Sequence, residues 1–467
     1  MNSKLLYSVL FLVTFTSFSQ VNLSGFYPST DVSGLGFGLA TALDQNNYVV
    51  SSNSFQNNQG KVFVFSLNNG TMTQQNVLFE NDVLSTDKFG SSVSIEGDFI
   101  VVGSSKHNVN LDNQGAIYIY RFIDGNWTFF QKIIAFDASE EDQFGSCVKI
   151  YNNTLFVSAP FSNNENSTGA VYVYELNGAN WEFENKLTVT GSIQLGEKIE
   201  VITDQMIVSD VTNEQNRVYH TFTLNESWSY SDSTSEFGNL ELNIKDFSFD
   251  GERIYITANK FSTSSPLNDI YILNRINNNW ELETTLSVNF NDFIIGKISV
   301  SANNMLVGFE NYILQTARKY PVHYYKKTNA DWVFQTLFYG EGTMAMDDDF
   351  GKSISLQGSN CIIGAPKEGF TANGKAYSFN LENLNTRTFD KKALVLYPNP
   401  TSGELFFDNF SSVSMEGFEI YSTLGKIVHS GKLENQSLSL KTLQNGLYFI
   451  RIQFQDGTIQ TVKVIKK

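Results

Sequence analysis

Short apolar runs alternate with turn residues along most of the chain, and this pattern predicts β-strands. In one representative stretch the runs are SSVSI from Ser91, then FIVVG, AIYIY and WTFFQKI. Gly97, Gly115 and Gly125 separate these runs, and glycines between β-branched and aromatic runs mark tight turns. The stretch therefore predicts four short antiparallel strands.

This four-strand unit recurs seven times. Its copies begin at Phe37, Phe89, Phe144, Leu195, Asn243, Ile295 and Phe350. All five tryptophans follow the third strands of units two to six and support the same register. They are Trp127, Trp181, Trp228, Trp280 and Trp332. Four strands repeated at roughly 50 residues are typical of propeller blades, so we expect an all-β protein with a seven-bladed β-propeller.

The repeat resembles the FG-GAP family, whose repeats also form the propeller head of integrin α-subunits. Phe-Gly pairs begin at Phe37, Phe89, Phe144 and Phe350, and GAP-like triplets begin at Ser158 and Gly364. Calcium-binding members carry a D-x-D-x-D-G type box between the first two strands, because a hard cation needs several oxygen ligands on one loop. The corresponding turns here, such as those at Asp44 and Asp250, hold fewer carboxylates. We therefore expect no calcium in these turns and no other cofactor.

The repeat ends near Lys392, and residues 393–467 alternate apolar and polar positions between glycine-centred turns. This pattern predicts a small immunoglobulin-like β-sandwich. The segment resembles the type A sorting domain of the Bacteroidetes type IX secretion system. The matching motifs are Tyr397-Pro398-Asn399-Pro400, Leu424-Gly425-Lys426, Gly446-Leu447-Tyr448 and Lys466-Lys467. The resemblance implies that residues 394–467 engage the outer-membrane translocon of that system.

The first residues have the pattern of a secretory signal peptide. Lys4 precedes the apolar run Leu5–Phe15, and Ser17 and Ser19 lie three and one positions before a cleavage point. We assign residues 1–20 to the signal peptide and residues 21–392 to the propeller. Since no later run reaches about 18 apolar residues, we expect no membrane span. The expected location is extracellular, either secreted or on the cell surface, after passage through the periplasm.

Composition narrows the set of partners. The 467 residues carry a net charge of −16, which makes nucleic acid an improbable partner because binding to phosphates needs a basic surface. Cys147 and Cys361 are the two cysteines, and they fall in units three and seven, which are not adjacent in a seven-membered ring. A disulfide requires Cα atoms within about 7 Å, so we expect both thiols to be free.

Few residues offer catalytic chemistry. The chain has four histidines and lacks the H-E-x-x-H, G-x-S-x-G and phosphate-loop motifs. His220 and His323 occupy equivalent third strands, where burial between units explains them better than a shared site. We therefore assign no catalytic residue.

Acidic clusters are the remaining candidates for a metal site. The candidates are Asp142, Asp347, Asp348 and Asp349, with Glu140 and Glu141 beside the first of them. Carboxylates this close together suit a cation or a glycosidase pair. However, Asp87, Asp142 and Asp348 each stand two residues before a Phe-Gly pair, and a recurring Asp at a turn is better explained by a hydrogen bond to the backbone.

Two functions from different classes fit these features. The first is a secreted or surface-displayed binding propeller that acts in adhesion and recognises a glycan or a protein, without catalysis. The second is an extracellular polysaccharide hydrolase or lyase that uses carboxylates on the propeller face. The scarcity of histidine favours the first.

Closure of the ring is a further expectation. Val21–Tyr27 precedes unit one in the place that a fourth strand occupies before other Phe-Gly pairs. We predict that it pairs with Lys375–Leu381 as the outer strand of the last unit, so that no open edge remains. The alternative is that Thr386–Lys391 completes that unit.

Overall fold

The computed structural model consists of two units, Met1–Leu381 and Glu382–Lys467. It describes residues 20–22, 25–26, 36–53, 59–68, 71–164, 167–211, 217–234, 242–261, 266–277, 279–288, 293–311, 320–329, 331–341, 349–367, 374–382, 395–408, 415–422, 426–432, 437–454 and 459–467. Residues 1–19 of the predicted signal peptide and the predicted boundary between residues 392 and 393 lie outside these ranges. None of the described residues forms a helix long and apolar enough to cross a membrane.

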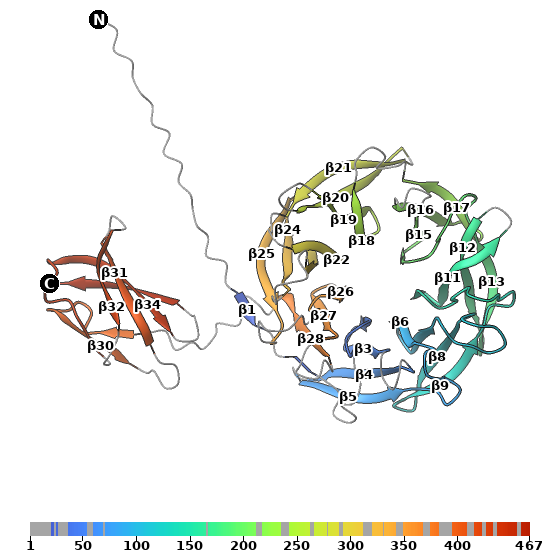
Figure 1. The fold of residues 1–467 in the computed structure, drawn as a ribbon, viewed down its shortest axis with the longest axis horizontal. Coiled ribbons are helices and arrows are strands. Elements are labelled where there is room, and N and C mark those ends of the chain that lie inside the picture. Colours follow the sequence, from blue (N-terminus) through green and yellow to red (C-terminus); the bar gives the residue numbers. More distant parts are fainter. Residues whose placement is uncertain are drawn as a thin grey trace, which may run out of the picture. The chain divides into compact units, whose positions relative to one another are not determined.

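The first unit is the predicted seven-bladed propeller, and Figure 1 shows its sheets arranged in a ring. Blade one comprises β2 (Thr41–Asp44), β3 (Asn47–Ser52), β4 (Lys61–Asn68) and β5 (Thr71–Leu78). Blade two comprises β6 (Phe89–Glu96), β7 (Phe99–Ser104), β8 (Ala116–Ile123) and β9 (Asn126–Ile133). Blade three comprises β10 (Val148–Tyr151), β11 (Thr154–Asn164), β12 (Ser167–Asn177) and β13 (Asn180–Leu187). Neighbouring strands within each blade are antiparallel.

Blades four to seven continue this order. They comprise β14 (Ile199–Ile202), β15 (Gln205–Val211), β16 (Arg217–Leu224) and β17 (Trp228–Ser233); β18 (Asn243–Phe249), β19 (Arg253–Phe261), β20 (Pro266–Ile276) and β21 (Asn279–Ser287); β22 (Phe293–Ser301), β23 (Asn304–Asn311), β24 (Val322–Thr328) and β25 (Asp331–Tyr339); and β26 (Ser353–Gln357), β27 (Asn360–Ala365) and β28 (Lys375–Asn380). The first strand of a blade lies nearest the centre of the ring, as β18, β22 and β26 show in Figure 1.

The Phe-Gly pairs fix the contact between successive blades. Phe89 and Phe144 are fully buried, and each packs edge-to-face on a third-strand tyrosine of its own blade. Gly145 has a φ of 90°, a conformation that favours glycine. A Cβ on Gly103 would lie 2.0 Å from the carbonyl oxygen of Gly145 in the next blade. Both glycines are therefore required for the close approach of blades two and three.

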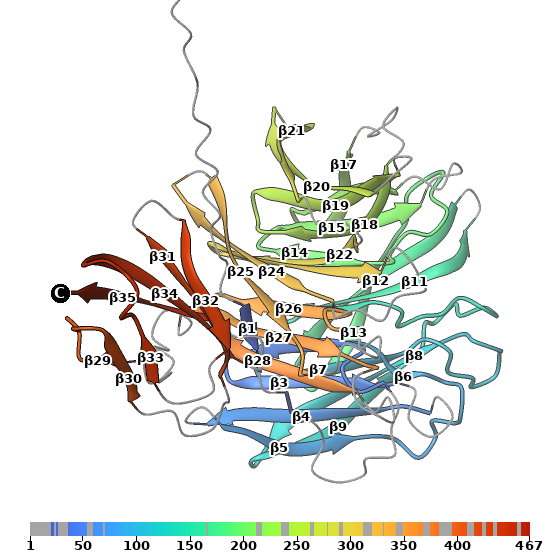
Figure 2. The same ribbon diagram turned by 60° about the vertical axis from the view of Figure 1, so that its left-hand side comes forward.

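The prediction for ring closure is partly confirmed and partly wrong. Phe26 forms two backbone hydrogen bonds with Ala376 of β28, at 2.8 and 3.1 Å, as predicted. However, β1 (Gln20–Asn22) pairs in parallel with β25 and extends blade six to five strands, and Figure 2 shows β1 beside that blade. The N-terminal segment therefore contacts two blades, because a parallel addition to β25 also satisfies its backbone groups. The alternative segment, Thr386–Lys391, lies outside the described residues.

The second unit has two sheets that share one hydrophobic core. One sheet has the order β29 (Val395–Tyr397), β30 (Glu404–Asp408), β33 (Ser437–Ser439), and the other has the order β32 (Ile427–Lys432), β31 (Met415–Ser422), β34 (Gly446–Phe454), β35 (Ile459–Lys466). Leu405 and Leu438 of the first sheet pack with Ile420 and Ile450 of the second. The unit therefore has a core of its own, and its immunoglobulin-like character stays a prediction.

Candidate functional site

The predicted acidic sites do not come together as a metal site in the described part of the chain. Asp142 is buried, and its Oδ2 accepts a hydrogen bond from the backbone N–H of Ser139 at 2.7 Å. Asp87 accepts one in the same way from Leu84 at 2.9 Å, so the predicted turn role is confirmed for both. Asp349 forms an ion pair with Lys367 at 3.0 Å. Asp347 and Asp348 lie outside the described residues, and the described ones contain no cluster of three or more metal-binding side chains.

Acidic side chains in the turns between first and second strands connect neighbouring blades. Asp44 of blade one accepts a hydrogen bond from the backbone N–H of Gly97 in blade two at 2.8 Å. Glu96 of blade two does the same for Asn152 in blade three at 2.6 Å. These carboxylates, which would be the ligands of a family calcium box, are thus used as ties between blades.

His220 and His323 are buried in β16 and β24, as predicted. Burial lowers the pKa of His323 to about 3, so this imidazole is neutral near pH 7. His107 has more partners. Its Nδ1 lies 2.6 Å from Asp87 Oδ2, and its Nε2 lies 2.8 Å from the ammonium of Lys132. Since His107 is also buried, this row of charged and polar groups ties loops of blade two together.

Blade three repeats the arrangement without its histidine. Ser162 takes the place of His107 and accepts a hydrogen bond from Lys186 at 3.3 Å. Asp142 takes the place of Asp87, and its Oδ1 is buried without a hydrogen-bond partner among the described residues. Burial raises the pKa of Asp142. Because the positive charge of Lys186 already acts on Asp142, this position is unsuited to binding a metal cation.

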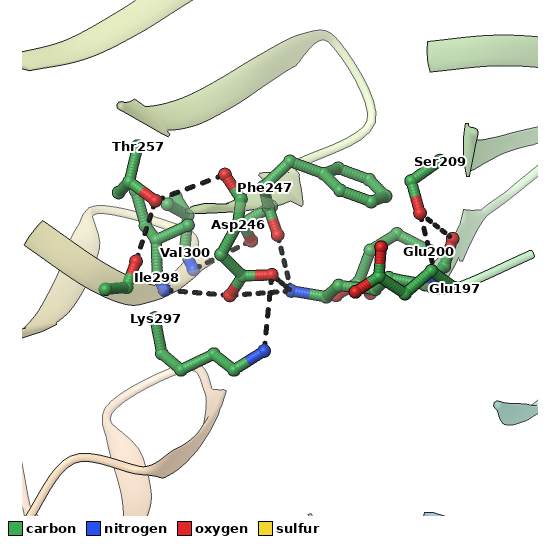
Figure 3. Close-up of polar contacts among 12 residues, drawn as sticks. Glu197, Glu200, Ser209, Asp246, Phe247, Thr257, Lys297, Ile298 and Val300 are labelled. Atoms are coloured by element: carbon green, nitrogen blue, oxygen red, sulfur yellow. Dashed lines mark hydrogen bonds and ion pairs between the residues drawn. The ribbon is translucent and has the colours of Figure 1, made fainter. Parts of the chain in front are cut away.

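A row of ion pairs crosses the first strands of blades three to six. Lys149 lies 3.1 Å from Glu200, which also lies 3.5 Å from Lys198. Asp246 lies between Lys198 at 3.1 Å and Lys297 at 3.9 Å, and Figure 3 shows its carboxylate also accepting the backbone N–H of Ile298, at 3.0 Å. Burial opposes ionisation of Asp246, but these positive partners hold its pKa below the usual range.

The charged residues of this row occupy the positions at which blades two and seven have serines that contact the next blade. In blade two Ser92, at the position of Asp246, donates its hydroxyl hydrogen to the Gly145 carbonyl of the next blade at 2.8 Å. In blade seven Ser353 donates in the same way to Gly38 of blade one at 2.8 Å. Blades four to six, whose units do not begin with a Phe-Gly pair, thus use charged groups where blades two and seven use hydroxyls, and we assign this row a structural role.

A cavity of about 320 Å³ lies between the outer strands of blades five and six. Its lining includes Trp332, Arg253, Glu283, Lys327 and Asp331. Arg253 Nε lies 2.6 Å from Glu283 Oε2, and the ammonium of Lys327 lies 5.7 Å from the centroid of the Trp332 ring. The volume falls in the range of small-molecule sites, which combine an aromatic surface with a few polar groups. This cavity is the candidate ligand site.

Trp332 differs from the other tryptophans at the same register. Trp127, Trp181, Trp228 and Trp280 are only 3–5% exposed, whereas Trp332 is partly exposed. Its ring contacts Tyr255 of blade five edge-to-face at 5.7 Å. The four buried tryptophans pack between blades, whereas the partly exposed Trp332 lines the cavity.

The sequence carries two recognisable modules. A family model for the FG-GAP repeat matches residues 72–120 and 127–174, and a model for the secretion system C-terminal sorting domain matches residues 395–467. The chain has FG-GAP repeats and a type IX sorting domain. This sorting domain directs export to the cell surface or extracellular space and interacts with the type IX machinery. No curated protein matches the sequence of the chain.

Several solved structures resemble this chain at low identity. PorZ of Porphyromonas gingivalis, a surface component of the type IX secretion system, is 11% identical with a TM-score of 0.49 over 95% of this chain and 61% of PorZ. A putative 6-phosphogluconolactonase from Bacteroides uniformis is 9% identical with a TM-score of 0.46, over 90% of this chain and all of that one. A subtype N10 neuraminidase-like protein of the influenza A virus of a little yellow-shouldered bat is 12% identical with a TM-score of 0.41, over 60% and 92%. The chain thus spans about three fifths of PorZ.

Sequence reasoning missed the cavity and the row of ion pairs. In the sequence, Trp332 has the same register as the other four tryptophans, so nothing at its own position indicates its greater exposure. The available signal was in the preceding unit, where Thr284 stands at the position of Gln131 and Asn185. Lys198 and Asp246 are 48 residues apart, and each resembles an ordinary exposed charge in the sequence.

Proposed function

We propose that this exported propeller is a binding protein of the cell surface or extracellular space, that it acts in adhesion, and that it has no catalytic activity of its own. The observation that carries the proposal is the partly exposed Trp332 in a cavity of about 320 Å³. An aromatic surface surrounded by a few polar groups is the usual composition of a recognition site.

The ion pairs and hydrogen bonds that hold the acidic groups support a binding function over a catalytic one. A glycosidase needs two carboxylates free to act as acid and as base or nucleophile. In the cavity, Glu283 is held in an ion pair by Arg253. Outside it, Asp87, Asp142 and Asp246 accept hydrogen bonds from the backbone or from structural partners. These carboxylates stabilise turns and blade contacts.

The test uses the full-length mature protein on an array of oligosaccharides and extracellular matrix proteins, with and without divalent cations. Each ligand that binds is then incubated with the protein, and new reducing ends and unsaturated products are measured. We expect saturable binding that survives chelation and yields no product. Turnover of a polysaccharide would support the hydrolase or lyase alternative instead. Absence of binding to every ligand would contradict the proposed function.

A further inference from the structure

The cavity lies at a blade contact where the described residues lack a side-chain tie that two other blade contacts have. Between blades two and three, the side chain of Gln131 spans both backbone groups of Trp181, donating to its carbonyl at 3.0 Å and accepting from its N–H at 2.8 Å. Between blades three and four, Asn185 donates to the carbonyl of Trp228 at 3.1 Å. These ties hold the outer strands of neighbouring blades together over the tryptophan.

Thr284 stands at the same register position in blade five. Gln131, Asn185 and Thr284 each pair with the third-strand residue just before the bulge, which is Ile119, Val173 and Ile272 respectively. The threonine side chain is two bonds shorter than that of glutamine, and the described contacts include no hydrogen bond from Thr284 to Trp332. Thr284 instead lines the cavity. The short side chain therefore leaves the Trp332 backbone without the bridge that Gln131 makes to Trp181.

We propose that this cavity binds one pyranose ring of a neutral glycan, an inference that rests on the binding function proposed above. A pyranose has a face of C–H groups that packs on an aromatic ring, and an edge of hydroxyls that needs donors and acceptors. Trp332 supplies an aromatic surface with low conformational freedom. Thr285, Asn329 and Asp331 line the same cavity and supply hydroxyl, amide and carboxylate groups for the hydroxyl edge.

Charge selects the neutral class of sugars. The lining contains two cationic and two anionic groups, Arg253 and Lys327 against Glu283 and Asp331, so its formal charge is zero. The whole chain carries −16, which repels polyanions at distances up to about the Debye length. A uronic acid polymer would therefore approach unfavourably and find no surplus cation.

The decisive variant is Thr284→Gln, which narrows the cavity and brings a side-chain amide to the Trp332 backbone, as Gln131 does at Trp181. We expect it to weaken binding of the neutral oligosaccharide at least about tenfold while the melting temperature stays equal or rises. Trp332→Ala removes the aromatic surface and should weaken binding at least about tenfold, the effect of losing a central aromatic contact. Tyr230→Ala is the matched control, because Tyr230 is a 49% exposed aromatic residue on the outer strand of blade four. It should leave affinity unchanged.

The probes are oligomers of glucose, mannose, galactose and xylose, with polygalacturonate as the anionic comparison, and affinity is measured by titration calorimetry. If Thr284→Gln binds a neutral oligomer as well as the unchanged protein does, the proposed site is wrong while the binding function stands. Preference for polygalacturonate would overturn the neutral class. Binding of matrix proteins alone, with no glycan bound, would overturn the inference and leave the proposed function intact. Failure to bind any ligand would overturn both.

Discussion

Gln357 of blade seven accepts a hydrogen bond through its side-chain oxygen from the backbone N–H of Gln45 in blade one, at 2.7 Å across 312 residues of sequence. Its amide nitrogen donates to Asp44 at 2.8 Å. Ser355 of the same strand donates to the carbonyl of Thr41 at 2.7 Å. The contact between the last and first blades is therefore built from the same polar ties as the other blade contacts, and the N-terminal segment adds to it.

Replacing Phe26 with alanine should weaken closure of the ring. Its ring packs edge-to-face on Phe65 of blade one with centroids 4.8 Å apart, while its backbone pairs with Ala376 of blade seven. Since the side chain is only partly buried, we expect a loss of about 1–3 kcal/mol in the free energy of unfolding, below that of a core phenylalanine. Urea denaturation measures this loss, and Phe129→Ala is the control because Phe129 is 49% exposed. Equal losses in both variants would mean that Phe26 does not join the two blades.

Asp246→Asn should destabilise the propeller by about 1–3 kcal/mol, because it removes the charged acceptor from ion pairs that are buried on the aspartate side and partly exposed on the lysine side. The side chain of Asp246 is 4% exposed, and Lys198 and Lys297 both lie within 4.0 Å of it. Burial of Lys198 favours its neutral form, yet the carboxylates around it raise its pKa. Asp246 is the largest of these raising influences, so the variant leaves Lys198 with Glu200 as its remaining carboxylate partner among those described.

The same residue predicts a dependence on pH. Because the pKa of Asp246 is lower in the folded chain than its ordinary value, its carboxylate contributes stability above about pH 4 and loses it as the pH falls through the folded value. Unfolding free energies of the unchanged protein and of Asp246→Asn should therefore converge in acid. Glu281→Gln, an exposed carboxylate on β21, is the control. A gap between the curves that stays constant down to the lowest pH would contradict this role.

Asp87 and Asp142 occupy equivalent positions, and exchanging the residues beside them, His107 and Ser162, should change the free energy of unfolding in opposite directions. His107→Ser leaves the buried Asp87 without its imidazole donor, and we expect a loss of about 2 kcal/mol. Ser162→His offers a donor to Asp142 Oδ1, which has none among the described residues, and should stabilise by about 1 kcal/mol. Thermal unfolding monitored by circular dichroism compares the two. A loss in both variants would show that blade three lacks room for the ring.

Deletion of residues 394–467 should leave a folded propeller inside the periplasm. The sorting domain directs export, and its hydrophobic core contains no propeller residue. Cell fractionation and resistance to proteolysis measure location and folding, and joining residues 394–467 back to the truncated chain should restore export. Normal extracellular amounts of the truncated protein would contradict this role of the segment.

The blades could be predicted because each repeats the same local pattern. Phe89, Phe144 and Phe350 mark first strands, and tryptophans mark the fourth strands of blades two to six. The positions of the strands could therefore be assigned without information about contacts between distant residues. Blades four to six, whose units do not begin with a Phe-Gly pair, were also placed correctly, with first strands at Ile199, Asn243 and Phe293. The free state of Cys147 and Cys361 followed from the blade count and is confirmed.

Features that depend on contacts between blades were not predictable in this way. The pairing of Gln20–Asn22 with β25 involves three residues, too few to show a periodic pattern. The contact beside the cavity differs from the contact at Trp181 in the length of Thr284 relative to Gln131, a difference of two bonds between side chains 153 residues apart. A sequence repeat shows which positions are equivalent, whereas the space between blades is set by the residues that break the equivalence.

The most direct test of the proposed site is a crystal structure of the mature chain with the neutral oligosaccharide that binds it best. We predict one pyranose ring between β21 and β25, with its C–H face on the indole of Trp332 and its hydroxyls within hydrogen-bond distance of Asn329 and Asp331. A sugar ordered at any other position, with this cavity filled by solvent, would contradict the account.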